Sequence, residues 1–209
     1  MLQRLLLPIF AIMILTSSIA QAAQICVVLD TPASSFAAPE KVYKAVQDSL
    51  DKMFANSRSE IMPISETDAY VQLYREQHGQ AYDSDNGVIT STGKRYLSLN
   101  PEDLVNIANH FNSDYLIYIR VTSSAPDTTY GFLTVGKKVN VILDFRVWST
   151  AKNDFVYLNR YITSGSSNAF YIGSGSSSKA VDDALNKGLK QVQEDSKIIN
   201  EKIAVEARS

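Results

Sequence analysis

The chain has 209 residues, of which 45% are hydrophobic and 20% are charged, and its formal net charge at pH 7 is −2. This balance argues against a protein that binds nucleic acid, and against a basic membrane-binding surface. Cys26 is the single cysteine, so an intramolecular disulfide and a thiolate metal site are both excluded. The composition predicts a domain that is held together by its hydrophobic core.

Residues 1–23 have the pattern of an export signal peptide. Arg4 provides a positive start, residues 5–15 form an apolar run, and Ala20-Gln21-Ala22 matches an A-x-A cleavage site. A membrane-spanning helix needs about 20 apolar residues, and this run is shorter and contains Pro8. We therefore expect a cleaved leader and a single exported domain over residues 24–209, periplasmic or secreted, with no transmembrane segment after processing.

A lipoprotein signal is the other possible reading of this leader, because Cys26 would then carry the lipid. Lipoprotein processing requires a small residue before the cysteine, and Ile25 occupies that position. The apolar run that contains Cys26 is typical of a buried strand, which makes the thiol a small core residue. The sequence therefore predicts an exported protein without a lipid anchor.

The first half of the chain predicts two strands and three helices. Strands are expected at 24–29 and 60–64. One helix begins at Pro39, a second begins at a capping box that starts at Ser65, and a third begins at Asn100. In the second helix Ala69, Leu73 and Gln77 lie along one side. Residues 80–98 are polar and are expected to form a long irregular loop.

The second half predicts three strands and one long helix. The strands are expected at 114–123, 138–149 and 154–164, with a hairpin at 150–153. A loop rich in Ser and Gly (164–178) then leads into a helix from Lys179 to about Ile203. The fold class is α/β (α+β): one mixed sheet of about five strands with helices packed on it, in the order β-α-β-α-α-β-β-β-α.

No motif in the chain predicts catalysis, a metal site or a cofactor. His78 and His110 are the only histidines, and neither lies in a metal-binding spacing. The Gly/Ser run 173–179 lacks the spacing of a phosphate-binding loop, and no G-x-S-x-G elbow is present. The sequence therefore predicts no catalytic, cofactor-binding or metal-binding residue.

Four charged residues on the predicted strands form a candidate binding site. Asp144 and Arg146 share one face of their strand, and Arg120 and Arg160 lie on the two neighbouring strands. With a suitable register, Asp144 would lie between guanidinium groups as in cross-strand ion pairs. Two readings remain open: a solvated charge ladder, or a recess in which arginines bind a carboxylate of a partner.

Four aromatic residues outside the predicted strands are candidate contacts for another protein. They lie in the connection before the middle strand and in the Gly/Ser loop, and are Tyr130, Phe132, Phe170 and Tyr171. Exposed aromatic side chains on loops are common anchors of protein interfaces. Packing back onto the domain is the alternative.

Residues 109–121, with the sequence NHFNSDYLIYIRV, resemble a signature of exported envelope proteins. Similar segments, in which a helix ends and an apolar strand begins, occur in the TolB N-terminal domain, in CsgG and in LpoB. Asn112-Ser113 replaces the usual Gly-Ala, and the acylated cysteine of CsgG and LpoB is missing. The stretches 80–98 and 124–137 are short and polar, so no pair of long hairpins is expected that could build a CsgG-like pore.

The resemblance implies a non-enzymatic protein that binds partners in the cell envelope, and this is the function that we expect. The partner would be a protein, and a homo-oligomer is compatible with the sequence. The alternative is an exported hydrolase or small-ligand-binding protein. That reading requires a pocket in which His78 or His110 meets an acid and a serine.

Overall fold

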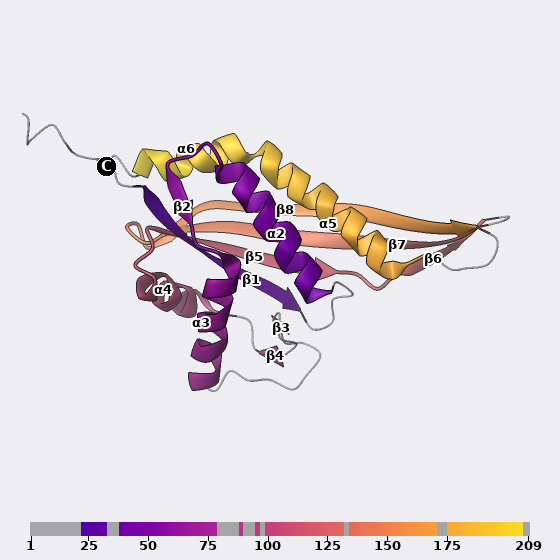
Figure 1. Cartoon of the computed structure of the whole chain (residues 1–209), viewed down its shortest axis with the longest axis horizontal. Coiled ribbons are helices and arrows are strands. Elements are labelled where there is room, and N and C mark those ends of the chain that lie inside the picture. Colours follow the sequence, from indigo (N-terminus) through magenta and orange to yellow (C-terminus); the bar gives the residue numbers. More distant parts are fainter. Residues whose placement is uncertain are drawn as a thin grey trace, which may run out of the picture.

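The computed structural model describes residues 22–32, 38–78, 88–89, 95–96, 99–131, 134–170 and 175–206. Its helices are α2 (Pro39–Phe54), α3 (Ile64–Gln77), α4 (Pro101–His110), α5 (Ser177–Glu194) and α6 (Ser196–Glu206). Its strands are β1 (Ala23–Pro32), β2 (Ser59–Ile61), β3 (Val88–Ile89), β4 (Arg95–Tyr96), β5 (Tyr115–Ser123), β6 (Asp127–Tyr130), β7 (Thr134–Ser149) and β8 (Asp154–Phe170). The predicted class, α/β with one mixed sheet, is confirmed (Figure 1).

The sheet combines parallel and antiparallel pairs. β1 is parallel to both β2 and β5, whereas β5, β7 and β8 are successively antiparallel. The predicted hairpin joins β7 to β8, and its turn includes Asn153 with a φ of 53°, a left-handed conformation that asparagine tolerates. The long β7 therefore pairs with three strands: β5, β6 and β8.

Helices cover the two faces of the sheet unequally. The larger core lies under α2, α5 and α6, and the odd-numbered residues of β1, such as Ile25 and Val27, point into it. The smaller core lies under α3 and α4, and Cys26 and Val28 point into it from the same strand. This alternation is expected for a strand that is buried on both faces.

The distal part of the sheet forms an arm. β6 pairs with β7 beyond the end of β5, so β6, β7 and β8 continue past the remaining strands (Figure 1). α5 lies directly on this arm, because a Cβ atom at Gly165 would overlap the backbone of Ala180 and Ala184. Glycine is required at this position by the close approach of helix and strand.

The strands are more numerous and longer than the sequence predicted. β3 and β4 lie in the stretch 80–98 that was expected to be irregular, and β6 lies in the connection 124–137. β7 starts at Thr134, and β8 continues through the expected Gly/Ser loop to Phe170. Pairing with β7 and contact with α5 compensate for the low strand propensity of this stretch. The second predicted strand is shorter, Ser59–Ile61.

Two helices also differ from the prediction. α3 begins at Ile64 without a side-chain cap, and it buries Val71 and Tyr74 while Leu73 is 49% exposed. The predicted long C-terminal helix is interrupted at Asp195 between α5 and α6. The hydrophobic spacing continues across the interruption, since Ile199 is buried in the same core as α5.

Candidate partner-binding surface

The strand register places Asp144 between two arginines. Arg120 of β5 pairs with Asp144 of β7, and Asp144 pairs in turn with Arg160 of β8. Directly paired residues project to the same side of a sheet. Arg146 lies two residues further along β7 and shares this side. The structure thus brings the four charged residues together, on the face opposite α2 and α5.

One ion pair uses the carboxylate at the centre of this row. Nε of Arg160 donates a hydrogen bond to Oδ1 of Asp144 at 2.6 Å, and the side chains are 60% and 14% exposed, respectively. This hydrogen bond raises the pKa of Arg160 above its ordinary value. Water screens such a pair, so it contributes little to stability. Its consequence is that Asp144 is already engaged.

The other two arginines have no carboxylate partner in the described part of the chain. Arg120 and Arg146 are half-buried, and neither forms an ion pair there. The guanidinium group of Arg146 lies over the rings of Tyr118 and Phe155, at 5.9 and 6.0 Å from the ring centroids. These contacts hold the guanidinium plane but leave its N–H donors available for a carboxylate.

A buried charge cluster holds Tyr118 in place below Arg146. The hydroxyl of Tyr118 donates to Oδ2 of Asp30 at 2.8 Å, and Nη2 of Arg75 donates to Oδ1 of Asp30 at 2.7 Å. The side chains of the ion pair are at most 1% exposed. Burial, together with the charge of Asp30, raises the pKa of Tyr118, which keeps its hydroxyl a donor.

Sequence analysis missed Asp30 and Arg75. The available signal was an acid that directly follows the apolar run 25–29, in a strand predicted to be buried. The partner of this acid, Arg75, lies on α3, 45 residues further along the chain, and was not singled out in the sequence. The contact of Asp30 with Arg75 could therefore not be anticipated.

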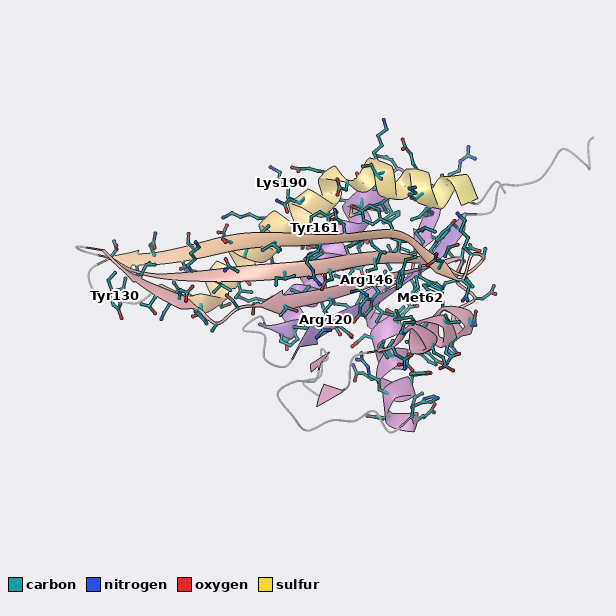
Figure 2. All side chains as sticks on the ribbon, turned by 180° about the vertical axis from the view of Figure 1, so that it is seen from behind. Met62, Arg120, Tyr130, Arg146, Tyr161 and Lys190 are labelled. Atoms are coloured by element: carbon teal, nitrogen blue, oxygen red, sulfur yellow. The ribbon has the colours of Figure 1, made fainter. Side chains whose placement is uncertain are left out.

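Exposed apolar side chains flank the charged row. Leu158 and Ile162 of β8 are 58% and 65% exposed, and they lie two residues before and after Arg160 on the same side of the strand. We call the surface formed by Arg120, Asp144, Arg146, Leu158, Arg160 and Ile162 the arginine face; Figure 2 shows Arg120 and Arg146 on it. Arginine beside exposed apolar side chains is a composition typical of protein interfaces.

Of the four aromatic candidates, only Tyr130 has a side chain among those that the structure describes. Tyr130 lies at the end of β6 rather than in a loop, and it is 81% exposed at the tip of the arm (Figure 2). Phe170 is the last residue of β8, not a loop residue, and its side chain lies outside the description. Phe132 and Tyr171 lie outside the described residues.

The two histidines occupy the surface of α3 and α4. His110 stacks on Tyr70 at 3.6 Å between ring centroids, and His78 stacks on Tyr74 at 4.0 Å. Nδ1 of His78 lies 2.8 Å from the backbone oxygen of Tyr74. Among the described residues, neither histidine has a hydrogen bond to a serine or an acid, so the constellation required for a hydrolase is not formed there.

Two surface grooves lie between helices. A groove of about 470 Å³ between α2 and α5 is lined by lysines that include Lys44, Lys52 and Lys190. A groove of about 560 Å³ lies between α2 and α3 beside Tyr43. Neither groove is lined by a histidine. Within the described ranges, no three His, Cys, Asp or Glu side chains are close enough together to bind a metal ion.

No helix in the part of the chain that the structure describes has the length and apolar character needed to cross a membrane. No family model and no curated protein matches the chain.

The chain is nevertheless similar to several solved structures. A hypothetical protein from Chlamydia trachomatis is 9% identical with a TM-score of 0.43, and the match covers 88% of this chain and 99% of that one. A lipoprotein from Neisseria meningitidis is 16% identical with a TM-score of 0.38, covering 82% and 99%. The LpoB C-terminal domain from Salmonella enterica is 10% identical with a TM-score of 0.35, covering 74% and 92%. The LpoB domain, whose family was named from the sequence, is thus among the solved structures that the chain matches.

Proposed function

We propose that the protein is an exported, non-enzymatic module of the cell envelope that binds a protein partner through the arginine face. The observation that carries this proposal is the state of Arg120 and Arg146. Both are half-buried on a sheet face, and neither has a carboxylate partner within the described ranges. Asp144 is engaged by Arg160. An acidic side chain of a partner would supply the missing negative charge.

The apolar part of the arginine face would add affinity to this recognition. Leu158 and Ile162 are more than half exposed, and covering each of them contributes roughly 1–2 kcal/mol. The charged residues would then select the partner, and the apolar residues would stabilise the complex. A protein partner fits this combination better than a small anion, which would leave the two apolar side chains exposed.

Export without a lipid anchor is the second part of the proposal. Cys26 lies inside β1, pairs with Leu116, and is completely buried. Lipoprotein processing at Cys26 would remove Ala23–Ile25 from this strand and would require an acyl group in the core. Cleavage at Ala22 leaves β1 intact, since the strand begins at Ala23. The alternative function, a hydrolase or small-ligand-binding protein, has no comparable support among the described residues.

Site-specific photo-crosslinking in cells that express the full chain tests the proposal. A photoreactive residue at Ile162 on the arginine face is compared with one at Ile198 of α6, which is 50% exposed and belongs to a helix on the opposite face of the sheet. We expect an adduct with an envelope protein from position 162 and none from position 198. The double variant Arg120→Gln/Arg146→Gln should lose this adduct.

The matched control removes two positive charges elsewhere, in Lys44→Gln/Lys190→Gln on the lysine-lined groove. This variant should keep the adduct. The proposal fails if position 162 captures nothing in intact cells. It also fails if the two double variants reduce the adduct equally, because net charge rather than the arginine face would then be responsible.

A further inference from the structure

The hydrogen bonds between α5 and β8 show which backbone groups of β8 point away from β7. The backbone oxygen of Ser164 accepts from Nζ of Lys187 at 3.1 Å, and the N–H of Ser166 donates to Oδ2 of Asp183 at 3.2 Å. These backbone groups therefore point away from β7. Pairing with β7 has no irregularity from Tyr157 to Phe170. The backbone N–H and C=O groups of successive residues point to opposite edges of a strand. The backbone groups of residues 158, 160 and 162 therefore also point away from β7.

α5 covers only the distal part of this edge. Lys187 and Asp183, which pair with each other at 2.7 Å, lie at Ser164 and beyond. Closer to the centre of the molecule, the N–H of Arg160 donates to the side chain of Asn159 in its own strand. In the described part of the chain, no side chain accepts a hydrogen bond from the outward N–H of Ile162. An edge of this kind is able to pair with another strand.

The side chains beside this edge define what the added strand must carry. Leu158, Arg160 and Ile162 alternate with residues that face α5 and α6, and their side chains are 58%, 60% and 65% exposed. A strand added beside β8 would place three of its own side chains, at every second position, next to these three. We infer that the partner adds a strand along residues 158–162 through a segment of the pattern apolar–x–acidic–x–apolar.

The charge of Arg160 determines that the central residue of that pattern is acidic. A carboxylate opposite Arg160 would lie on the side that carries Arg146 and Arg120, where Asp144 is the only acid among the six residues of the arginine face. A lysine at the same position would lie beside the guanidinium group of Arg160 and be repelled by it. A carbonyl of the added strand would replace Oδ1 of Asn159 as the acceptor for the N–H of Arg160, while Nδ2 of Asn159 can keep its bonds to Tyr157 and Asp195. This inference rests on the proposed function, and it specifies the segment that the partner supplies.

Two capped peptides test the inference on the protein purified from cells that express the full chain. One has the sequence Thr-Val-Thr-Glu-Thr-Val-Thr, and the other has lysine in place of glutamate. We expect the glutamate peptide to bind about tenfold more tightly than the lysine peptide. Arg160→Gln should reduce this preference about two- to five-fold, as expected for one cross-strand pair.

The contribution of the edge itself is tested by Ile162→Pro, which removes the outward N–H while proline remains acceptable on an edge strand. Ile162→Val keeps the N–H and serves as control. Ile162→Pro should lose peptide binding, and Ile162→Val should retain it. On the unsubstituted protein, the glutamate peptide should slow amide hydrogen exchange at Ile162, a measurement that does not depend on the folding of a variant.

Strand addition is refuted if neither peptide binds, if both bind equally, or if Ile162 shows no added protection. It is also refuted if Ile162→Pro binds the glutamate peptide as the unsubstituted protein does. In that last case a loss of the cellular adduct in Arg120→Gln/Arg146→Gln would still support the proposed function. The two ideas therefore fail separately.

Discussion

Replacing Asp30 by leucine will strongly destabilise the protein, because Asp30 is the acid of a completely buried ion pair. The substitution removes the carboxylate that pairs with Arg75 at 2.7 Å and accepts from Tyr118 at 2.8 Å. Breaking a buried pair by removing one partner costs about 3–5 kcal/mol. For a chain of this size, that corresponds to a fall in melting temperature of roughly 6–20 °C.

Urea and thermal unfolding, followed by circular dichroism, measure this effect in Asp30→Leu, Arg75→Met and the double variant. We expect the double variant to be more stable than either single variant, since it removes both charges from the core, with a coupling energy of about 2–3 kcal/mol. Lys41→Gln is the control, because its pair with Asp182 is exposed and should contribute less than about 1 kcal/mol. Single variants that cost no more than this control would refute the reasoning.

Three further predictions concern the packing of α5, the cysteine and the interruption between the last two helices. Gly165→Ala should destabilise the protein by about 1–3 kcal/mol because its Cβ overlaps α5. Gly188→Ala, whose Cβ has room, should stabilise the protein by about 0.5 kcal/mol. Equal urea unfolding midpoints for the two variants would contradict this prediction. Burial raises the pKa of Cys26 to about 11, so the thiol should resist iodoacetamide in the native state. Burial of the protonated Cys26 thiol contributes fully to stability below the pKa that this thiol has in the unfolded chain, and this contribution should be lost between about pH 9 and 11. Rapid labelling of the native protein at pH 8 would argue against burial. Hydrogen bonds from Tyr161 and its neighbours lower the pKa of Asp195, so Asp195→Asn should cost about 1 kcal/mol at neutral pH. This difference should shrink as pH falls below about 4, and a pH-independent difference in urea unfolding would refute the assignment.

The sequence was sufficient to predict the class of the fold and the presence of the charged residues on neighbouring strands, but it left the strand register open. Clean alternation of Val, Leu and Phe from Val139 to Val147 identified the core face of β7, and Asp144 and Arg146 followed on the opposite face. The adjacent strands had the same character, so Arg120 and Arg160 were assigned to neighbouring positions. The structure places both opposite Asp144.

The remaining features depend on tertiary contacts that have no local pattern. Residues 165–170 have the composition of a linker, yet they form a strand because β7 provides their hydrogen bonds and α5 lies on Gly165. The seven-residue spacing of Val192 and Ile199 is compatible with one continuous helix, yet the helix is interrupted at Asp195, which binds two tyrosines of β8. In both places, partners that are distant in sequence decide the local conformation.

The position of β1 has a consequence for the order in which the protein would fold during the proposed export. β1 directly follows the predicted leader, so it is the first strand to leave the translocation channel. Its neighbour β5 comes much later, as the bond between Gln24 and Asp114 spans 90 residues. The hairpin of β7 and β8, by contrast, closes over a short turn. Local contacts form faster than distant ones, so the pairing of β1 with β5 is expected to form after the hairpin of β7 and β8. Under the proposed export, the apolar run Ile25–Leu29 of β1 would lack its β5 neighbour until that later strand has crossed the membrane.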